Sequence, residues 1–192
     1  MAERKKHRPG QIDADVFRAL PERAQEIWFQ YCEKCVVRNN IDALTFPVLC
    51  GFDYSFCKSP IEVIFNLAYD LIIHYGDSEA YFLEPQYEVV SRNKENKYYV
   101  DFAFIAEDFE EFITTIKNPN FKLAIECDGH EFHEKTKEQV QQDNEREYEL
   151  KMSGFDVLHF SGSQIYNNPF KCAAQTLNYI KEKVEKNPNG RC

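Results

Sequence analysis

The spacing of apolar residues first indicates helices in this chain of 192 residues. From Ile61 to Ile72 the apolar side chains recur every three or four positions, as they do along one face of a helix. The preceding Ser59 and Pro60, with Glu62, form a capping box, so the helix is predicted to begin there. An earlier helix is predicted from near residues 20–22, where a proline precedes a glutamate, to about residues 38–40.

The pattern then changes to that of strands. Residues 87–90 and 98–105 are rich in aromatic and β-branched side chains, and a polar segment separates them, which predicts a hairpin. Residues 121–127 form a third, strongly apolar strand, and residues 155–160 a short fourth one.

Two more helices complete the prediction. A polar helix should run from about residue 135 to 152, with Gly154 just past its end, and a last helix from about 169 to 186. The resulting order predicts an α/β fold in which one mixed four-stranded sheet is flanked by helices. We expect residues 1–58 to form an N-terminal basic arm, a helix and a loop, and residues 59–187 to form the main domain.

Composition limits the possible environments. The chain is 43% hydrophobic and 15% aromatic, which favours a packed core over disorder. It lacks an apolar export signal and any run of about 18 apolar residues, so we expect a cytoplasmic protein without a membrane partner. Seven cysteines are expected to be reduced thiols. Cys32, Cys35, Cys50 and Cys57 could together bind a structural zinc, but core packing of the first pair in a helix is favoured.

The most informative stretch is the end of the third strand. Its apolar run leads into Glu126, Cys127 and Asp128, followed by a glycine and two histidines. Side chains alternate along a strand, so the two carboxylates should share a face, where they would repel one another without a cation. Such oxygen-rich clusters suit Mg²⁺ or Mn²⁺.

Asp101 adds a second acidic position. It lies within an otherwise apolar strand, where an isolated carboxylate is costly, although an edge-strand acid facing water is the alternative. If the strands are neighbours, Asp101 and Glu126 could hold a divalent cation, with the Cys127 carbonyl as third ligand and Asp128 as a further one. Such a metal would favour phosphodiester hydrolysis, because it acidifies water and neutralises charge on the phosphate. The net charge of −9 lowers the expectation of a nucleic-acid substrate, because phosphate binding usually leaves a basic footprint.

Four motifs carry a resemblance to a known family: V-D-F-A-F, K-L-A-I-E-C-D-G-H-E-F-H, D-N-E-R-E and G-F-D-V-L-H-F-S. They resemble the PD-(D/E)XK nuclease superfamily, especially its branch similar to very-short-patch-repair endonucleases, over about residues 59–180. The resemblance implies a restriction-endonuclease-like core of order αβββαβ and a Mg²⁺- or Mn²⁺-dependent endonuclease, with DNA the favoured substrate. It makes Asp101 and Glu126 the metal-binding pair, and it places Asp128 where the superfamily usually has a lysine.

The same resemblance suggests a base. The very-short-patch-repair-like branch lacks that lysine and uses a histidine, which aligns with His133, while His130 is the nearby alternative. Relatives also carry a catalytic glutamate on the preceding helix, at the place of Glu62, for which the capping box is a competing explanation.

Three basic residues are candidates for substrate binding: Arg146, Lys135 and Lys137. Arg146 could contact phosphate or hold Glu126, or it could pair with Asp143 on a solvated helix surface. The lysines could replace the charge that the usual lysine position lacks. A catalytically inactive nuclease-fold binding or regulatory module is the alternative function, and a homodimer is one possible assembly.

Overall fold

A four-stranded mixed sheet forms the centre of the protein. The computed structural model describes residues 14–39, 54–75, 81–91, 96–109, 118–128 and 136–185. The strands lie in the order β1 (Glu84–Val90), β2 (Lys97–Ile105), β3 (Lys122–Asp128) and β4 (Phe155–Ser161). β2 is antiparallel to both β1 and β3, and β3 and β4 are parallel. The predicted mixed sheet is therefore confirmed.

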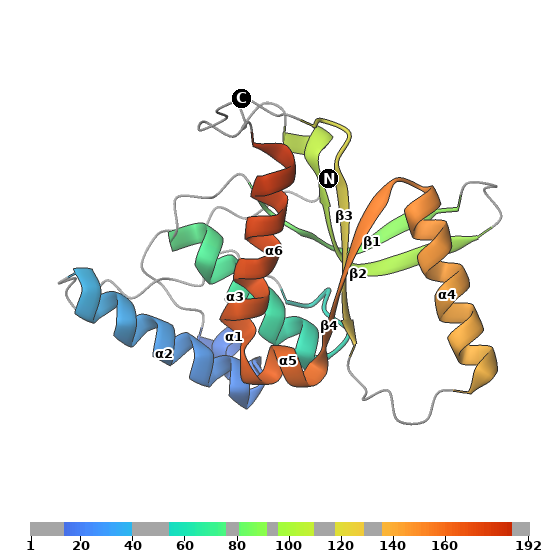
Figure 1. The fold of residues 1–192 in the computed structure, drawn as a ribbon. Helices are drawn as coiled ribbons and strands as arrows, with labels where there is room; N and C mark the ends of the chain where they lie inside the picture. Colours follow the sequence, from blue (N-terminus) through green and yellow to red (C-terminus); the bar gives the residue numbers. More distant parts are fainter. Residues whose placement is uncertain are drawn as a thin grey trace.

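Helices cover the two faces of the sheet unequally (Figure 1). One side carries α1 (Ala14–Ala19), α2 (Glu22–Asn39), α3 (Pro60–Tyr75), α5 (Gly162–Asn167) and α6 (Pro169–Val184). The other side carries α4 (Lys137–Met152), and a short 3₁₀ helix, η1 (Ala106–Phe109), follows β2. This is the restriction-endonuclease-like α/β architecture with a helical extension at its N-terminal end.

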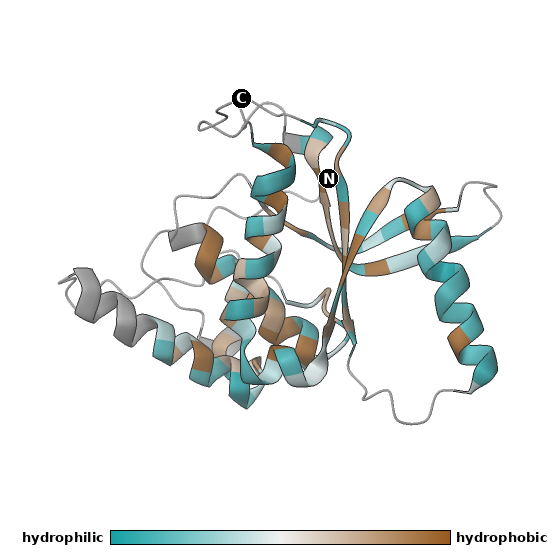
Figure 2. Cartoon of the chain, viewed as in Figure 1, coloured by the Kyte–Doolittle hydropathy of each residue, from teal (hydrophilic) through white to brown (hydrophobic). Residues whose placement is uncertain are grey.

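The core has two parts that follow the alternation of the strands. Phe102 and Leu123 pack with the large group of helices, whereas Ala103 and Ala124 pack with Leu150 of α4. Leu150 is the buried residue of α4, and Figure 2 shows this helix as mostly hydrophilic. Consequently α4 covers the sheet mainly through its C-terminal part.

Most predicted elements are present at nearly the predicted bounds. One half of the predicted capping box before α3 is present, since Glu62 N donates to Ser59 Oγ at 3.2 Å, but the Glu62 carboxylate accepts from the backbone N–H of Lys58 instead of that of Ser59. Gly154 follows α4 with a φ of 87°, the left-handed conformation expected of a C-cap glycine. Three short elements were not predicted: α1, η1 and α5.

The N-terminal helix α2 shares the core of the main domain. Ile27 and Trp28 are buried in the same cluster as residues of α3 and α6, and Arg23 Nε donates to the Tyr166 carbonyl at 3.1 Å. The division at residue 58 stays a prediction. The zinc alternative stays a prediction, because among its four cysteines the structure describes only the side chain of Cys57, which is not in a disulfide.

Among the helices in the described ranges, none has both the length and the hydrophobicity of a membrane-spanning segment.

Candidate active site

The two acidic positions predicted from the sequence meet where β2 and β3 separate. The two strands pair from Ile105 opposite Lys122 as far as Phe102 opposite Ile125, whereas β3 continues beside β4 to Asp128. Beyond that point the Asp101 side chain replaces the backbone pairing: its Oδ2 accepts a hydrogen bond of 2.7 Å from the backbone N–H of Cys127. Asp101 thus ties β2 to the end of β3.

The sheet is irregular at Asp101. Val100 and Ala103 both pack in the cluster on the α4 side, although strict alternation would place them on opposite faces. On the neighbouring strand, Gln86 has a φ of 51°, which is uncommon for a residue other than glycine. Its Nε2 donates to Glu62 Oε2 at 3.0 Å. The strands therefore change phase beside the acidic cluster.

Glu126 is a buried carboxylate with one cationic neighbour. It is 5% exposed, and its Oε1 lies 2.8 Å from Arg146 Nη2. The same Nη2 donates to the Tyr99 carbonyl at 2.6 Å, and no donor among the described residues is aligned for a hydrogen bond with Oε1. Burial raises the pKa of Glu126 to about 7, although Arg146 acts in the opposite direction; Asp101 raises it further. The surroundings of Glu126 are therefore short of positive charge.

The same shortage is seen at Asp101. Burial is the largest cause that raises its pKa; the hydrogen bond from Cys127 and the charge of Arg146 lower it, while Glu62 and Asp128 raise it. Two neighbouring carboxyls thus both resist ionisation. A bound cation would favour their charged forms.

Glu62 lies beside this pair and is itself buried. Its Oε2 accepts hydrogen bonds from the Lys58 backbone N–H at 2.8 Å and from Gln86. Neither contact is the bond to the Ser59 N–H that a capping box would make, so capping does not by itself explain the position of Glu62, and its charge reaches Asp101.

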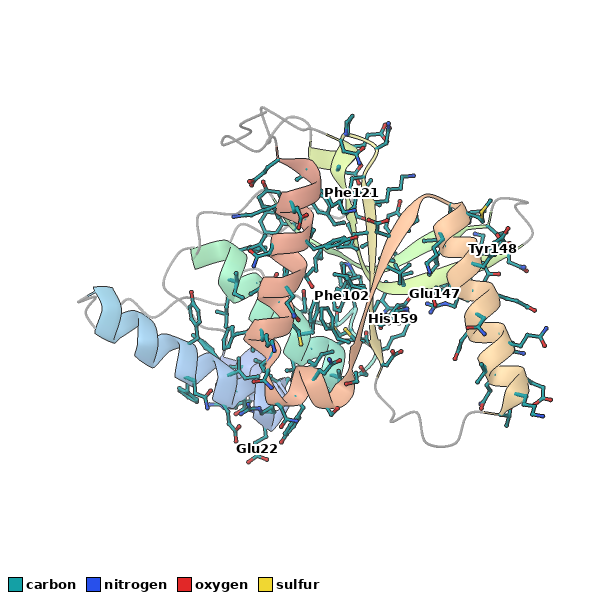
Figure 3. The ribbon with its side chains drawn as sticks, in the orientation of Figure 1. Glu22, Phe102, Phe121, Glu147, Tyr148 and His159 are labelled. Atoms are coloured by element: carbon teal, nitrogen blue, oxygen red, sulfur yellow. The ribbon has the colours of Figure 1, made fainter. Side chains whose placement is uncertain are left out.

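Asp128 faces a histidine that sequence reasoning missed. The Nδ1 atom of His159, on β4, lies 3.5 Å from Asp128 Oδ2. The hydrogen bond with Asp128 is the main cause that raises the pKa of His159, and Glu126 and Glu147 add to it. Figure 3 shows His159 on the side of the sheet that faces α4 and Glu147. The parallel register, with Glu126 opposite His159, could have revealed this neighbour.

The other predicted residues lie elsewhere. His130, His133 and Lys135 are outside the described residues. Lys137 is exposed and lines a cavity of about 540 Å³ between α4 and the start of β2, together with Asn96 and Tyr98. It stands at the first residue of α4, roughly 13 Å along the helix from Arg146.

Oxygen donors suited to a metal ion lie at the end of β3. No group of three or more His, Cys, Asp or Glu side chains within the described ranges is arranged to hold a metal ion. However, Mg²⁺ is commonly held by one or two carboxylates and keeps several waters. Asp101, Glu126 and the Cys127 carbonyl are oxygen donors of this kind, and the buried Glu126 Oε1 lacks a hydrogen bond from the described residues. The donor set therefore fits Mg²⁺ or Mn²⁺.

Comparison with known proteins identifies a family. Residues 80–180, which are 101 of the 192 residues, match the sequence model of a restriction endonuclease-like family, REase_MTES_1575. The matched segment contains Asp101, Glu126, Asp128 and His159 but not Glu62, and it does not select the very-short-patch-repair-like branch. Searches of curated proteins and of solved structures gave no match. The chain belongs to the restriction endonuclease-like family REase_MTES_1575.

Proposed function

We propose that the protein is a divalent-metal-dependent endonuclease that hydrolyses phosphodiester bonds, with DNA as the favoured substrate. The observation that carries this proposal is the meeting of Asp101 and Glu126 at the end of the β2–β3 ladder, joined through the Cys127 peptide. Both carboxyls have raised pKa values, so a bound cation would stabilise the ionised form of each.

Mg²⁺ or Mn²⁺ held by Asp101, Glu126 and the Cys127 carbonyl would supply charge neutralisation at the phosphate and an acidified water. The protein contributes position. The hydrogen bond from the Cys127 N–H fixes the Asp101 carboxylate relative to the Cys127 peptide, and Arg146 holds Glu126. Asp128 is proposed as an additional ligand or as a residue that positions water.

The general base is assigned to His133, with His130 as the alternative. The support is the resemblance of the G-H-E-F-H segment to the very-short-patch-repair-like branch. Glu62 is proposed to act on the same water from α3, since its charge reaches Asp101. Arg146, Lys135 and Lys137 are proposed to contact substrate phosphates.

The alternative function is an inactive nuclease-fold binding or regulatory module. One observation favours it: the position that usually holds a lysine is Asp128, which lies against His159. Calorimetry with Mn²⁺ separates the two functions, because an inactive module should show no metal binding that depends on Asp101.

The direct test is cleavage of plasmid, single-stranded, branched DNA and RNA with Mg²⁺, Mn²⁺ or EDTA. Asp101→Asn should abolish activity while keeping an oxygen that can accept the Cys127 N–H. Asp156→Asn is the matched control, because Asp156 lies at the opposite end of the sheet, where it accepts from Tyr179 Oη and pairs with Lys183. Equal activity of the wild type and Asp101→Asn would reject the assignment.

A further inference from the structure

A lysine and a tyrosine form a contact beside the acidic site. Lys58 lies in the segment just before α3, and its Nζ is 5.4 Å from the centroid of the Tyr99 ring. Tyr99, on β2, is 48% exposed, so the pair is at the surface. Its Oη donates to Glu88 Oε2 at 2.7 Å. The ring is thereby held in one orientation.

Two separate connections place this pair next to the carboxylates. The Tyr99 carbonyl accepts from Arg146 Nη2, the atom that lies 2.8 Å from Glu126. The backbone N–H of Lys58 donates to Glu62, whose charge reaches Asp101. Lys58, just before α3, and Tyr99, on β2, therefore both lie beside the acidic site.

Lys58 differs from the neighbouring cations Lys97 and Arg146 in its contacts. Lys97 pairs with Glu88 and Arg146 with Glu126, each at less than 3 Å. Within the described ranges, Lys58 makes no ion pair, and its ammonium group contacts the Tyr99 ring. A cation–π contact restricts the ammonium without neutralising it, so its N–H groups can still bind an anion.

A cation at this place could bind a phosphate group of a nucleic acid. The chain has a net charge of −9, and the nearby carboxylates repel an approaching nucleic-acid backbone. We propose that Lys58, positioned by Tyr99, binds a phosphate of the substrate strand adjacent to the one that is cleaved. This inference rests on the proposed function, and it adds a substrate-binding residue on the α3 side of the sheet.

The experiment measures binding of a fluorescein-labelled DNA oligonucleotide by the full chain in the Asp101→Asn background, at several salt concentrations. Lys58→Met removes the charge but keeps the apolar stem. It should weaken binding roughly three- to tenfold and reduce the slope of log K against log salt by about 1. In the cleaving wild-type background it should raise KM and leave kcat unchanged.

Lys183→Met is the matched control. Lys183 also lies over a tyrosine, 5.1 Å from the Tyr179 ring, but it packs at the α6 side with Asp156. Lys183→Met changes the net charge by the same amount as Lys58→Met but lies away from the proposed phosphate site. It should therefore leave the salt slope unchanged. Tyr99→Phe should keep most of the affinity, because it loses only the hydrogen bond with Glu88 and keeps the ring. Tyr99→Leu should lose more affinity and should have no additional effect in the Lys58→Met variant.

The outcomes separate the two proposals. An unchanged salt slope in Lys58→Met, with active wild type, rejects the inference and leaves the nuclease function intact. DNA binding that depends on Lys58 without metal-dependent cleavage by wild type rejects the nuclease function, and with it the position of Lys58 beside a cleaved phosphate, and supports phosphate binding by Lys58 alone. A wild type that neither binds nor cleaves DNA or RNA rejects both.

Discussion

Replacing Glu126 with glutamine should stabilise the metal-free protein at pH 8 and leave its stability nearly unchanged below pH 4.5. The folded-state pKa of Glu126 is about 7, above its ordinary value of 4.5. Between these values the folded protein holds a proton that the unfolded chain has released, so the free energy of unfolding falls as the pH rises through this window. Glutamine has no charge to bury and avoids the loss.

The size of the effect follows from the two pKa values. They differ by about 2.5, and each unit corresponds to about 1.4 kcal/mol, so the predicted gain at pH 8 is about 3 kcal/mol. The raised pKa already includes the favourable contact with Arg146, so this figure is the net cost of ionising Glu126 in the folded chain. A gain of this size is large for a single substitution.

Urea denaturation in EDTA at pH 4.5 and pH 8 measures the difference. Glu147→Gln is the control, because Glu147 is an exposed carboxylate of α4 whose pKa is lowered by its hydrogen bond with Lys151. It should be slightly destabilising at pH 8, by at most about 0.5 kcal/mol. If Glu126→Gln had the same effect at both pH values, the raised pKa and the argument for a charge-deficient site would be refuted.

Substitutions at three further positions test other contacts and a backbone conformation. Arg146→Ala should raise the pKa of Glu126 above 7 in a ¹³C NMR titration, because the guanidinium opposes the effect of burial; an unchanged pKa would contradict the ion pair. His159→Gln should remove a stabilising contact that is fully present below pH 6.5 and is lost as the pH rises through the raised pKa of His159, so urea midpoints of variant and wild type should converge above that pKa. Gly154→Ala should lower stability by about 1 kcal/mol in thermal unfolding, because alanine is strained at a φ of 87°. No atom lies within 4 Å of the added Cβ, so backbone strain is the whole cost, and Gly154→Asn should cost less.

Much of the fold could be predicted because local patterns and tertiary packing agree. The N-cap at Ser59 and the apolar strands could be predicted without long-range information. The helix α5 was missed although Ser161 and Gln164 form a complete capping box. Its six residues carry one buried side chain, Ile165, so no helical period could be read there.

The site was predictable only in part, for a similar reason. Asp101 and Glu126 are conspicuous because each interrupts an apolar strand. To predict that His159 lies beside the acidic residues, one would need the parallel register of β3 and β4. The contact between Lys58 and Tyr99 joins residues 41 positions apart. No local pattern encodes such contacts.

The irregularity at Asp101 explains why the sequence pattern fails where the chemistry is expected. A regular β2 would keep Val100 and Phe102 on one face, but they pack in different clusters on the two sides of the sheet. The phase change coincides with the positive φ of Gln86 and with the end of the β2–β3 ladder, and each departure costs stability. The packing of Phe65 against Phe102 and Phe160, with ring centroids 5.4 and 5.8 Å apart, lies on the α3 side of the same strands and can offset that cost. A sheet that only had to be stable would pair fully and bury no carboxylate, so the gain expected for Glu126→Gln measures how far this region departs from that optimum.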